Sequence, residues 1–490
     1  MNSAVVALVG IIWLVVAYRV YGRLIERRLV KPNDEVETPA YTLRDGVDYF
    51  PAKPLVLFGH HFASIAGAGP IIGPVMAASA FGWGGPALWI LVGVVVIGAV
   101  HDYTTLIVSI RHEGRSIPDI TRSVVGEKAR VLFLLFVWIT LLFVIAVFTI
   151  AAAKSFIADP RIVIPAFGLV PISMIFGWLV NRKGLPLLLG TGIALALLSA
   201  LFMLGLSTPI ALPFERETSL QLWIVILLFY GLVAAVLPVW ILLQPRDYVA
   251  YWILVVGMLL GFGGLFISGR PITAPFVVGW VSDSQGPIWP MLFILVACGA
   301  VSGFHSLVSS GTTAKQLSKE SHAKPVAFGA MLTEGALALL ALLAVTAGLD
   351  YGGETTLTES AAALPSLADY LGKGGGGPIA AFAAGFGTFT DSFLPGVGAL
   401  FGMTMLNAFV LTTLDTSVRL ARFITADQLQ LEAFQLCGGS HFQCQPASLN
   451  RLDAAWEHGL FVGWTIDVSG RGDRQADVRD LRRIDRGDRS

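Results

Sequence analysis

Long apolar stretches dominate this chain, and polar residues come mainly in short clusters between them. A helix needs about 20 apolar residues to cross the hydrocarbon core of a bilayer. Segments of that length predict an all-α, polytopic membrane protein with about 11 transmembrane helices. The predicted crossings are 4–20, 54–78, 86–110, 131–156, 162–179, 185–204, 221–243, 248–268, 288–309, 326–347 and 397–418.

The second predicted crossing is interrupted near its middle. Residues 58–74 read FGHHFASIAGAGPIIGP, in which Gly67, Gly69 and Pro70 disfavour a continuous helix. Lipid offers no partner to freed backbone groups, so such a break survives only where it is buried in protein or lines a polar cavity. The stretch therefore indicates a binding site.

A second interruption falls in the crossing at 221–243, where Pro238 lies inside the helix and Pro245 ends it. The two interrupted crossings are five crossings apart. Because this number is odd, the second group of five helices has the opposite orientation in the membrane. Paired interruptions of this kind indicate the central site of a transporter. We predict a 5+5 inverted repeat, with one repeat at about 54–204, the other at about 221–418, and the first crossing outside them.

Composition narrows the class of protein. With 490 residues, 55% hydrophobic and 13% charged, and a mean hydropathy of +0.73, a soluble multidomain protein is excluded. The formal net charge of zero gives no indication of nucleic acid as a partner. Cys298, Cys437 and Cys444 have no zinc-like or redox spacing, so we expect neither a metal site nor a disulfide framework. The first apolar run lacks a convincing cleavage site and is expected to be a retained helix.

Lys and Arg fall mainly on one side of the predicted membrane, which the positive-inside rule assigns to the cytoplasm. The N-terminus is then outside and the C-terminus inside. Counting 379–393 as another crossing would move Arg419 and Arg422 outside, so we predict an external interfacial or re-entrant helix there. The basic residues of the cytoplasmic side are Arg19, Arg23, Arg27, Arg28, Lys31, Arg111, Arg115, Arg122, Lys128, Arg130, Arg182, Lys183, Arg246, Lys315, Lys319, Lys324, Arg419 and Arg422.

Ionisable residues of several predicted crossings share one depth. At 1.5 Å per residue, His101 and Asp102 lie about 14 to 15 Å from the cytoplasmic end and Glu334 about 14 Å. His61 lies about 10 Å deep beside His60. One interpretation is a proton-coupled site, in which Asp102 or Glu334 binds the proton and a histidine shuttles it or orients the substrate. The other is a set of interhelical hydrogen bonds, which for His305 alone is the favoured one.

Three further polar groups leave alternatives open. Ser302 to Thr313 is rich in hydroxyls, which suit a Na⁺ site or simple bonds back to the helix carbonyls. Arg246 and Asp247 could form a gate salt bridge, or Arg246 could anchor at the cytoplasmic face while Asp247 caps the next helix. Asp415 and Arg419 are four residues apart, and i,i+4 pairing accounts for them.

Six stretches, taken together, resemble the carbon starvation protein (CstA) family of bacterial inner-membrane transporters, in the order in which that family carries them. They cover roughly residues 1–425. The probability that so many motifs agree by chance is very small. The stretches are 58–74, GAVHDY at 98–103, VSIRHEGRSI at 108–117, LLQPRDY at 242–248, SSGTTAKQL at 309–317 and LTTLDTSVRL at 411–420.

The resemblance implies a LeuT-like inverted-repeat fold within the amino acid, polyamine and organocation superfamily, which agrees with the five-helix offset. It also implies uptake of a small nutrient during carbon starvation. Members are associated with proton-coupled pyruvate import and with peptide uptake. Pyruvate needs only an anion-binding helix end, whereas a peptide also needs a partner for its ammonium group.

The chain departs from this resemblance after about residue 424. Residues 426–490 are polar and are expected to form a disordered cytoplasmic tail. The abrupt change suggests a truncated or frameshifted reading frame, which resequencing of the locus would test.

We therefore expect a secondary transporter that imports a small organic acid, most simply pyruvate, by proton symport, with peptide as the alternative substrate. A membrane nutrient sensor is the rival class, and an enzyme is not expected. We expect H⁺ or, alternatively, Na⁺ as the coupling ion. No cofactor is predicted, and membrane lipids are the expected surroundings of the protein. The expected substrate-binding residues are His61, Ser64, Gly67, Gly69, Pro238 and Ser306, the coupling residues are His101, Asp102 and Glu334, and the gating residues are Arg246 and Asp247.

Overall fold

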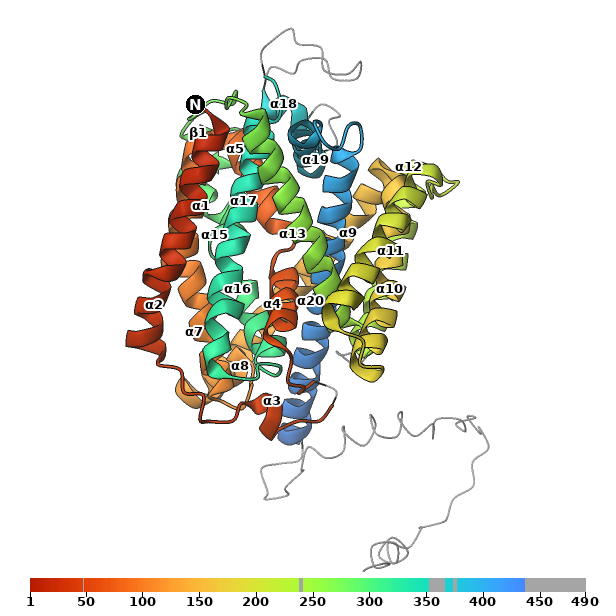
Figure 1. The fold of residues 1–490 in the computed structure, drawn as a ribbon. Coiled ribbons are helices and arrows are strands. Elements are labelled where there is room, and N and C mark those ends of the chain that lie inside the picture. Colours follow the sequence, from red (N-terminus) through yellow and green to blue (C-terminus); the bar gives the residue numbers. More distant parts are fainter. Residues whose placement is uncertain (47, 238–240, 352–365, 373–376, 437–490) are drawn as a thin grey trace, which may run out of the picture. The chain divides into compact units, whose positions relative to one another are not determined.

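The computed structural model describes residues 1–46, 48–237, 241–351, 366–372 and 377–436 (Figure 1). The chain divides into two units, Met1–Gln430 and Leu431–Ser490, and nearly all described residues belong to the first. Within the described ranges the fold is helical apart from one small hairpin, β1 (Val281–Ser282) and β2 (Gly286–Pro287). The prediction of an all-α polytopic membrane protein is confirmed.

Among the described residues, nine continuous spans are long and apolar enough to cross a membrane. They are α1 (Ser3–Arg19) with α2 (Tyr21–Ile25) and η1 (Glu26–Val30), α6 (Gly84–Gly93) with η2 (Val94–Gly98) and α7 (Ala99–Ile110), α9 (Glu127–Ala158), η3 (Pro160–Ile162) with α10 (Val163–Arg182), α11 (Leu187–Ser207), α12 (Arg216–Val236), α13 (Leu243–Ser268), η5 (Glu320–His322) with η6 (Lys324–Gly329) and α17 (Ala330–Ala347), and α20 (Gly398–Leu436). A tenth is the pair α4 (Pro54–Ile65) and α5 (Gly69–Phe81), bent by 41° at the predicted break.

The predicted crossing at 288–309 is not one helix. It forms α14 (Ile288–Leu295), α15 (Ala297–Ala300), α16 (Gly303–Val308) and then the π-helical η4 (Ser309–Thr313). Val301 and Ser302 have extended backbone between α15 and α16. Apolar composition does not reveal this interruption, because only single glycines, Gly299 and Gly303, flank Val301 and Ser302, and no proline does.

The crossings at 54–78 and 288–309, which we call the two interrupted crossings from here on, touch each other at their breaks. A Cβ on Gly69 would lie 2.6 Å from Cys298 Cβ, and one on Gly73 would lie 2.1 Å from the carbonyl oxygen of Leu295. The glycines of α5 therefore let its backbone approach α14 and α15 closely. The partner of the first break is thus a segment for which the sequence predicted an intact helix.

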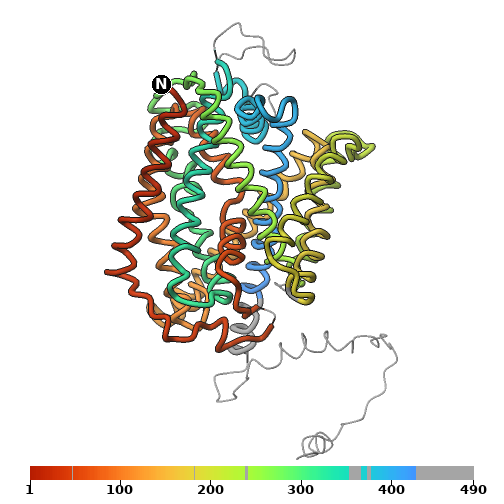
Figure 2. The backbone as a smooth tube through the Cα atoms, viewed as in Figure 1, coloured from red at the N-terminus to blue at the C-terminus, as the bar shows by residue number. Residues whose placement is uncertain are grey.

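Helices α17 and α20 form the interior. Their most apolar windows are 83% and 89% buried, against 17% for α9. Figure 2 traces α4 in front of α20, and Thr413 donates a hydrogen bond to the carbonyl oxygen of Ser64, 349 residues away in the sequence. Helices α9 to α12 stand together at one side, as Figure 1 shows. The first crossing lies at the periphery, where Gly10 of α1 packs against Leu339 of α17.

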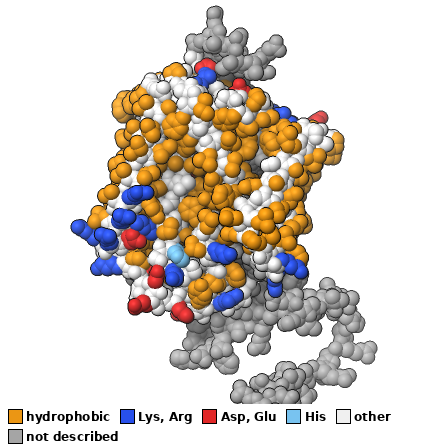
Figure 3. All heavy atoms as spheres, in the orientation of Figure 1, with side chains coloured by type: hydrophobic (Ala, Val, Ile, Leu, Met, Phe, Trp, Pro, Cys, Tyr) orange, Lys and Arg blue, Asp and Glu red, His pale blue; other side chains and the backbone are white. Residues whose placement is uncertain are grey.

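Basic residues gather at one end of the helices, the lower end in Figure 3. There Arg111 forms hydrogen bonds of 2.9 Å to both carboxylate oxygens of Glu320, which raise the pKa of Arg111. Hydrogen bonds from Ser321 hold the pKa of Asp34 below its ordinary value. The N-terminus lies at the opposite end, where Ser3 bonds to the carbonyl oxygen of Arg270.

The remaining elements are short. The segment predicted not to cross, 379–393, forms α19 (Gly377–Thr390), whose 14 residues are too few to span a bilayer. It packs backbone to backbone on α17, since a Cβ on Gly385 would lie 1.9 Å from the carbonyl oxygen of Ala344. The other short helices are α3 (Pro39–Thr42), α8 (Ile117–Val124) and α18 (Leu367–Gly372).

Two predictions fall partly outside the described residues. Pro238 is not among them, so the interruption of the crossing at 221–243 and the inverted repeat of 54–204 and 221–418 stay predictions. Helix α20 continues to Leu436, ten residues past the predicted start of the polar tail at 426. Residues 437–490 lie outside the described part.

Candidate transport site

Three networks of buried polar side chains lie around the two interrupted crossings. We call them the acid–histidine network (His101, Asp102, His305 and Glu334), the Asp247 network (His60, Ser64, Gln244, Asp247 and Gln316) and the arginine network (Tyr230, Arg246 and Asp415). Most of these side chains have no exposed surface. Burial of so many ionisable groups in a membrane domain is costly and indicates a functional site.

The acid–histidine network joins α7, α16 and α17. Asp102 is bonded through one carboxylate oxygen to His101 Nδ1, at 2.9 Å, and through the other to His305 Nδ1, at 2.8 Å. On the other side of the His305 ring, Nε2 lies 3.1 Å from Glu334 Oε2. One imidazole thus lies between two buried carboxylates: it is hydrogen-bonded to Asp102, whereas its Nε2 and Glu334 Oε2 are close to each other but form no hydrogen bond.

Each of the three segments that carry this network contains a π-helical turn. These turns are η2 before Asp102, η4 after His305 and η6 before Glu334. Single π turns are rare and are frequent at functional sites. Nothing in residue spacing predicted them.

The Asp247 network joins α4, α13 and the turn that follows η4. Asp247 Oδ2 lies 2.5 Å from His60 Nδ1 and accepts a hydrogen bond of 3.2 Å from Ser64. Gln316 contacts His60 Nε2 at 3.3 Å and is held by Gln244 at 3.0 Å. Asp247 is therefore a partner of the interrupted helix α4.

His61 lies between these two networks. Its Nδ1 is 2.9 Å from Thr313 Oγ1 of η4, and its Nε2 is buried without a hydrogen-bond partner among the described residues. Asp102, His305 and His60 are all within electrostatic range of its ring. Of the predicted binding residues, His61 is the one with a free polar atom.

The arginine network joins α12, α13 and α20. Arg246 Nη1 bonds to Asp415 and, at 3.3 Å, to the carbonyl oxygen of Leu411. Tyr230 donates a hydrogen bond of 2.7 Å to Asp415, and its ring centroid lies 5.5 Å from the Arg246 guanidinium carbon. Both charged side chains are fully buried.

Two interpretations of the sequence are corrected here. Helix α13 begins at Leu243 rather than 248, so Asp247 lies inside its first turns and does not cap it, and Arg246 is not a surface anchor. Asp415 pairs with Arg246 instead of Arg419, whose Nη2 donates to the carbonyl oxygens of Ala234 and Leu237. Both corrections follow from burial, because each buried charged side chain needs a partner from another helix.

The hydroxyls of α16 and η4 mostly bond locally. Ser306 donates to the carbonyl oxygen of Gly303, Ser310 to that of Ser306 and Thr312 to that of Val308. Ser306 therefore lies in its own short helix, apart from the three networks. Thr313 alone contacts a network-flanking residue, His61.

The predicted residues are thus only partly brought together. Gly67 and Gly69 lie at the break, where a Cβ on Gly67 would lie 2.8 Å from Thr413 Oγ1. His101 belongs to the acid–histidine network but keeps 34% of its side chain exposed. The sequence did not single out Gln316 or Tyr230. It also did not predict that Cys298 contacts Glu334 or that Asp415 contacts Arg246, because each contact joins distant segments.

Cys298, His305 and Glu334 could also offer donors to a metal ion, since their donor atoms all lie within 4.8 Å of one another. His305 and Glu334 already contact each other directly, and Cys298 Sγ lies 3.6 Å from Glu334 Oε1. We assign this cluster to the acid–histidine network.

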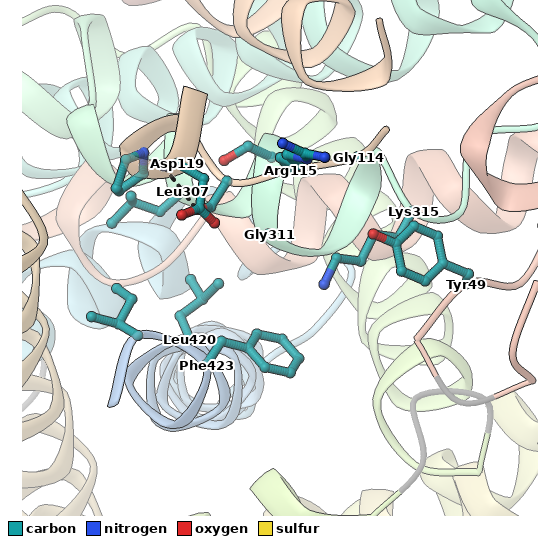
Figure 4. Close-up of a pocket in the computed structure, with 13 residues that line it drawn as sticks. Tyr49, Gly114, Arg115, Asp119, Leu307, Gly311, Lys315, Leu420 and Phe423 are labelled. Carbon is teal, nitrogen blue, oxygen red and sulfur yellow. Dashed lines mark hydrogen bonds between the residues drawn. The ribbon is translucent and has the colours of Figure 1, made fainter. Parts of the chain in front are cut away.

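A cavity of about 220 Å³ opens at the basic end, beside η4 (Figure 4). Figure 4 places Lys315 and Tyr49 on one side of it and Asp119 on the other. Lys315 Nζ lies 4.6 Å from the Phe423 ring centroid and 5.3 Å from that of Tyr49. Ser310 and Gly311 line the cavity while Thr313 contacts His61, so η4 forms the wall between this cavity and the buried networks.

Comparison with known proteins supports the family resemblance found in the sequence. The family model described as carbon starvation protein CstA matches residues 2–443. The peptide transporter CstA of Mycobacterium tuberculosis is 34% identical over 86% of this chain and 62% of its own length. The peptide transporter CstA of Bacillus subtilis is 35% identical, over 87% and 75%.

The pyruvate/proton symporter BtsT of Escherichia coli is 33% identical, over 87% of this chain and 69% of its own length. This chain thus spans between 62% and 75% of these three relatives. No solved structure matches it. The extent of the family match settles the classification: the chain belongs to the carbon starvation protein CstA family.

Proposed function

We propose that this chain is a proton-coupled secondary transporter for a small organic acid, with pyruvate as the first substrate. The observation that carries the proposal is His305, which lies between Asp102 and Glu334 where the two interrupted crossings meet. The relatives named a pyruvate/proton symporter and peptide transporters support the same class of activity.

Charge balance connects the proton to the substrate. Two carboxylates and one imidazole share a buried space, so adding or removing one charge there without compensation is costly. A substrate monoanion brings one negative charge, and a proton taken up by the acid–histidine network offsets it. Proton binding and anion binding then favour each other, as symport requires.

The substrate preference follows from which acids are free. Both oxygens of Asp102 are bonded to histidines, and Glu334 contacts His305 and Cys298. Asp102 therefore offers little to a substrate ammonium group, which favours a simple anion such as pyruvate, and Glu334 Oε2 is the one oxygen of these two acids without a hydrogen bond among the described residues. Peptide is the second candidate because Asp247 Oδ1 is buried without a partner among the described residues and could accept a bond from an ammonium group.

The coupling ion is H⁺ in this proposal. Local bonding of Ser310 and Thr312 weakens the case for a Na⁺ site after α16. The predicted cell inner membrane location, with the basic end in the cytoplasm and the N-terminus outside, is part of the same proposal and follows from the positive-inside rule.

Purified protein in proteoliposomes tests the function. Radiolabelled pyruvate should accumulate when an inward proton gradient is imposed and should only equilibrate without one. An excess of unlabelled alanyl-alanine that abolishes accumulation would move the substrate assignment toward peptides. Pyruvate binding without any accumulation would contradict transport and favour a sensor.

A further inference from the structure

Arg246 has one edge of its guanidinium group without a partner. Nη1 is bonded to Asp415 and to the carbonyl oxygen of Leu411, whereas Nε and Nη2 are buried and have no hydrogen-bond partner among the described residues. The side chain has no exposed surface. Buried guanidinium donors left unpaired are costly, so this edge needs an acceptor.

The two free groups are the pair that binds a carboxylate best. Nε–H and one Nη2–H lie on the same edge of the planar guanidinium group and can form two parallel hydrogen bonds to the two oxygens of one carboxylate. The opposite face of the side chain is supported by the Tyr230 ring, and Asp415 is fixed by the Tyr230 hydroxyl. Arg246 is therefore held in one orientation before any ligand binds.

Its location is at the interruption of α4 and α5. Arg246 reaches Leu411, and two residues further along α20 Thr413 contacts the last turn of α4 through the carbonyl oxygen of Ser64 and lies against Gly67. Asp247, the next residue of α13, is bonded to His60 and Ser64 of α4. Arg246 is therefore part of the turn of α13 that contacts α4 next to the break.

We propose that Arg246 is the carboxylate-binding residue of the transport site and that its Nε and Nη2 groups hold the substrate carboxylate in a bidentate pair. This assignment rests on the proposed transport function and replaces the gating role predicted from the sequence. Arg246 and Asp415 together are neutral, so the incoming carboxylate is the uncompensated charge that the acid–histidine network offsets by taking up a proton. The same contact would serve the terminal carboxylate of a peptide.

Ligand protection of the full-length protein in detergent tests this contact without any gradient. The probes are pyruvate and alanyl-alanine, each compared with its neutral amide, and the readout is the rise in melting temperature with ligand concentration. We expect at least one of the two acids to protect the native protein and its amide to fail. In R246K, half-maximal protection should need about tenfold more of that acid or beyond, because one charge-assisted hydrogen bond is lost.

Two further variants separate binding from folding. R246Q/D415N removes both charges, so no unpaired carboxylate remains, and it should fold but lose protection. R419K alters another buried arginine, whose Nη2 donates to the carbonyl oxygen of Ala234 in α12, and should keep the native ligand affinity even if its melting temperature falls.

Each result has one meaning. Native affinity in folded R246K and R246Q/D415N, equal protection by acid and amide, or no protection of the native protein by any probe would overturn the assignment. Loss in the Arg246 variants with retention in R419K supports it. A native protein that is protected through Arg246 but fails to accumulate substrate in proteoliposomes would contradict the proposed transport function and leave the carboxylate site standing.

Discussion

Asp102, His305 and Glu334 lie in a row, with a hydrogen bond on the Asp102 side of the imidazole and a close approach without a hydrogen bond on the Glu334 side. Asp102 is bonded to His305 at 2.8 Å, and the far nitrogen of that ring is 3.1 Å from Glu334. The imidazole can accept a proton on one nitrogen and release another from the opposite one. In the proposed mechanism, His305 is therefore the residue that passes a proton between the two acids.

Replacing His305 by Gln should break this path. We expect gradient-driven pyruvate uptake to fall by about a hundredfold or more, the usual effect of losing a proton-transfer group. H101N is the matched comparison, because His101 contacts Asp102 but is partly exposed and does not reach Glu334. It should reduce uptake less. Initial rates in proteoliposomes measure both, and equal losses in the two variants would count against a relay through His305.

The sequence could predict which residues are buried and ionisable, but not which of them meet. Counting residues from the predicted membrane edge brought Asp102 and Glu334 to one depth, and the structure places His305 between them. Depth carries no information on the angular position of a side chain around the bundle. The pairing of Arg246 with Asp415, 169 residues away, is therefore beyond any local pattern.

The helices themselves were largely predictable, because a length of about 20 apolar residues is a strong constraint. The interruptions were predicted only where glycine and proline cluster, as at Gly67 to Pro70. The crossing at 288–309 instead unwinds around Val301 and Ser302, which are flanked by single glycines and by no proline. Before that point, the backbone of α5 approaches α14 and α15 closely at Leu295 and Cys298.

Gly73 tests this close packing. In G73A the new Cβ would lie 2.1 Å from the carbonyl oxygen of Leu295, so α5 and α14 must separate. We expect a loss of about 2 kcal/mol in stability, the typical effect of overpacking. In G263A on α13 the new Cβ meets no atom within 4 Å, and stability should be unchanged or slightly higher. Melting temperatures of the two variants in detergent measure the difference. A G73A protein as stable as G263A would show that the two interrupted segments are not in backbone contact.

The two ends of the helical domain differ in charge. The basic end is built by segments far apart in the sequence, as in the pairs Arg111 with Glu320 and Lys324 with Glu26. The opposite end carries the N-terminus and the hairpin β1–β2, with Arg270 paired to Asp350. The proposal that the basic end lies in the cytoplasm rests on this asymmetry and on the positive-inside rule.

Single cysteines placed at the two ends test this orientation. Ser123 in α8 and Ser284 in the hairpin are both exposed and are suitable positions once the three native cysteines are replaced by serine. S284C should react with a membrane-impermeant maleimide in intact cells, and S123C only after permeabilisation. The reverse pattern would place the N-terminus inside and overturn the assigned direction of import.

The most direct test of proton coupling compares two modes of transport in the D102N protein. In proteoliposomes, net accumulation of labelled pyruvate under an inward proton gradient requires the proton to be bound and released in each cycle. Exchange of labelled for unlabelled pyruvate across the membrane, at equal concentrations and without a gradient, requires only that the site reorients. We predict that D102N loses accumulation but retains exchange. Accumulation in D102N at the native level would contradict the assignment of the proton to the acid–histidine network.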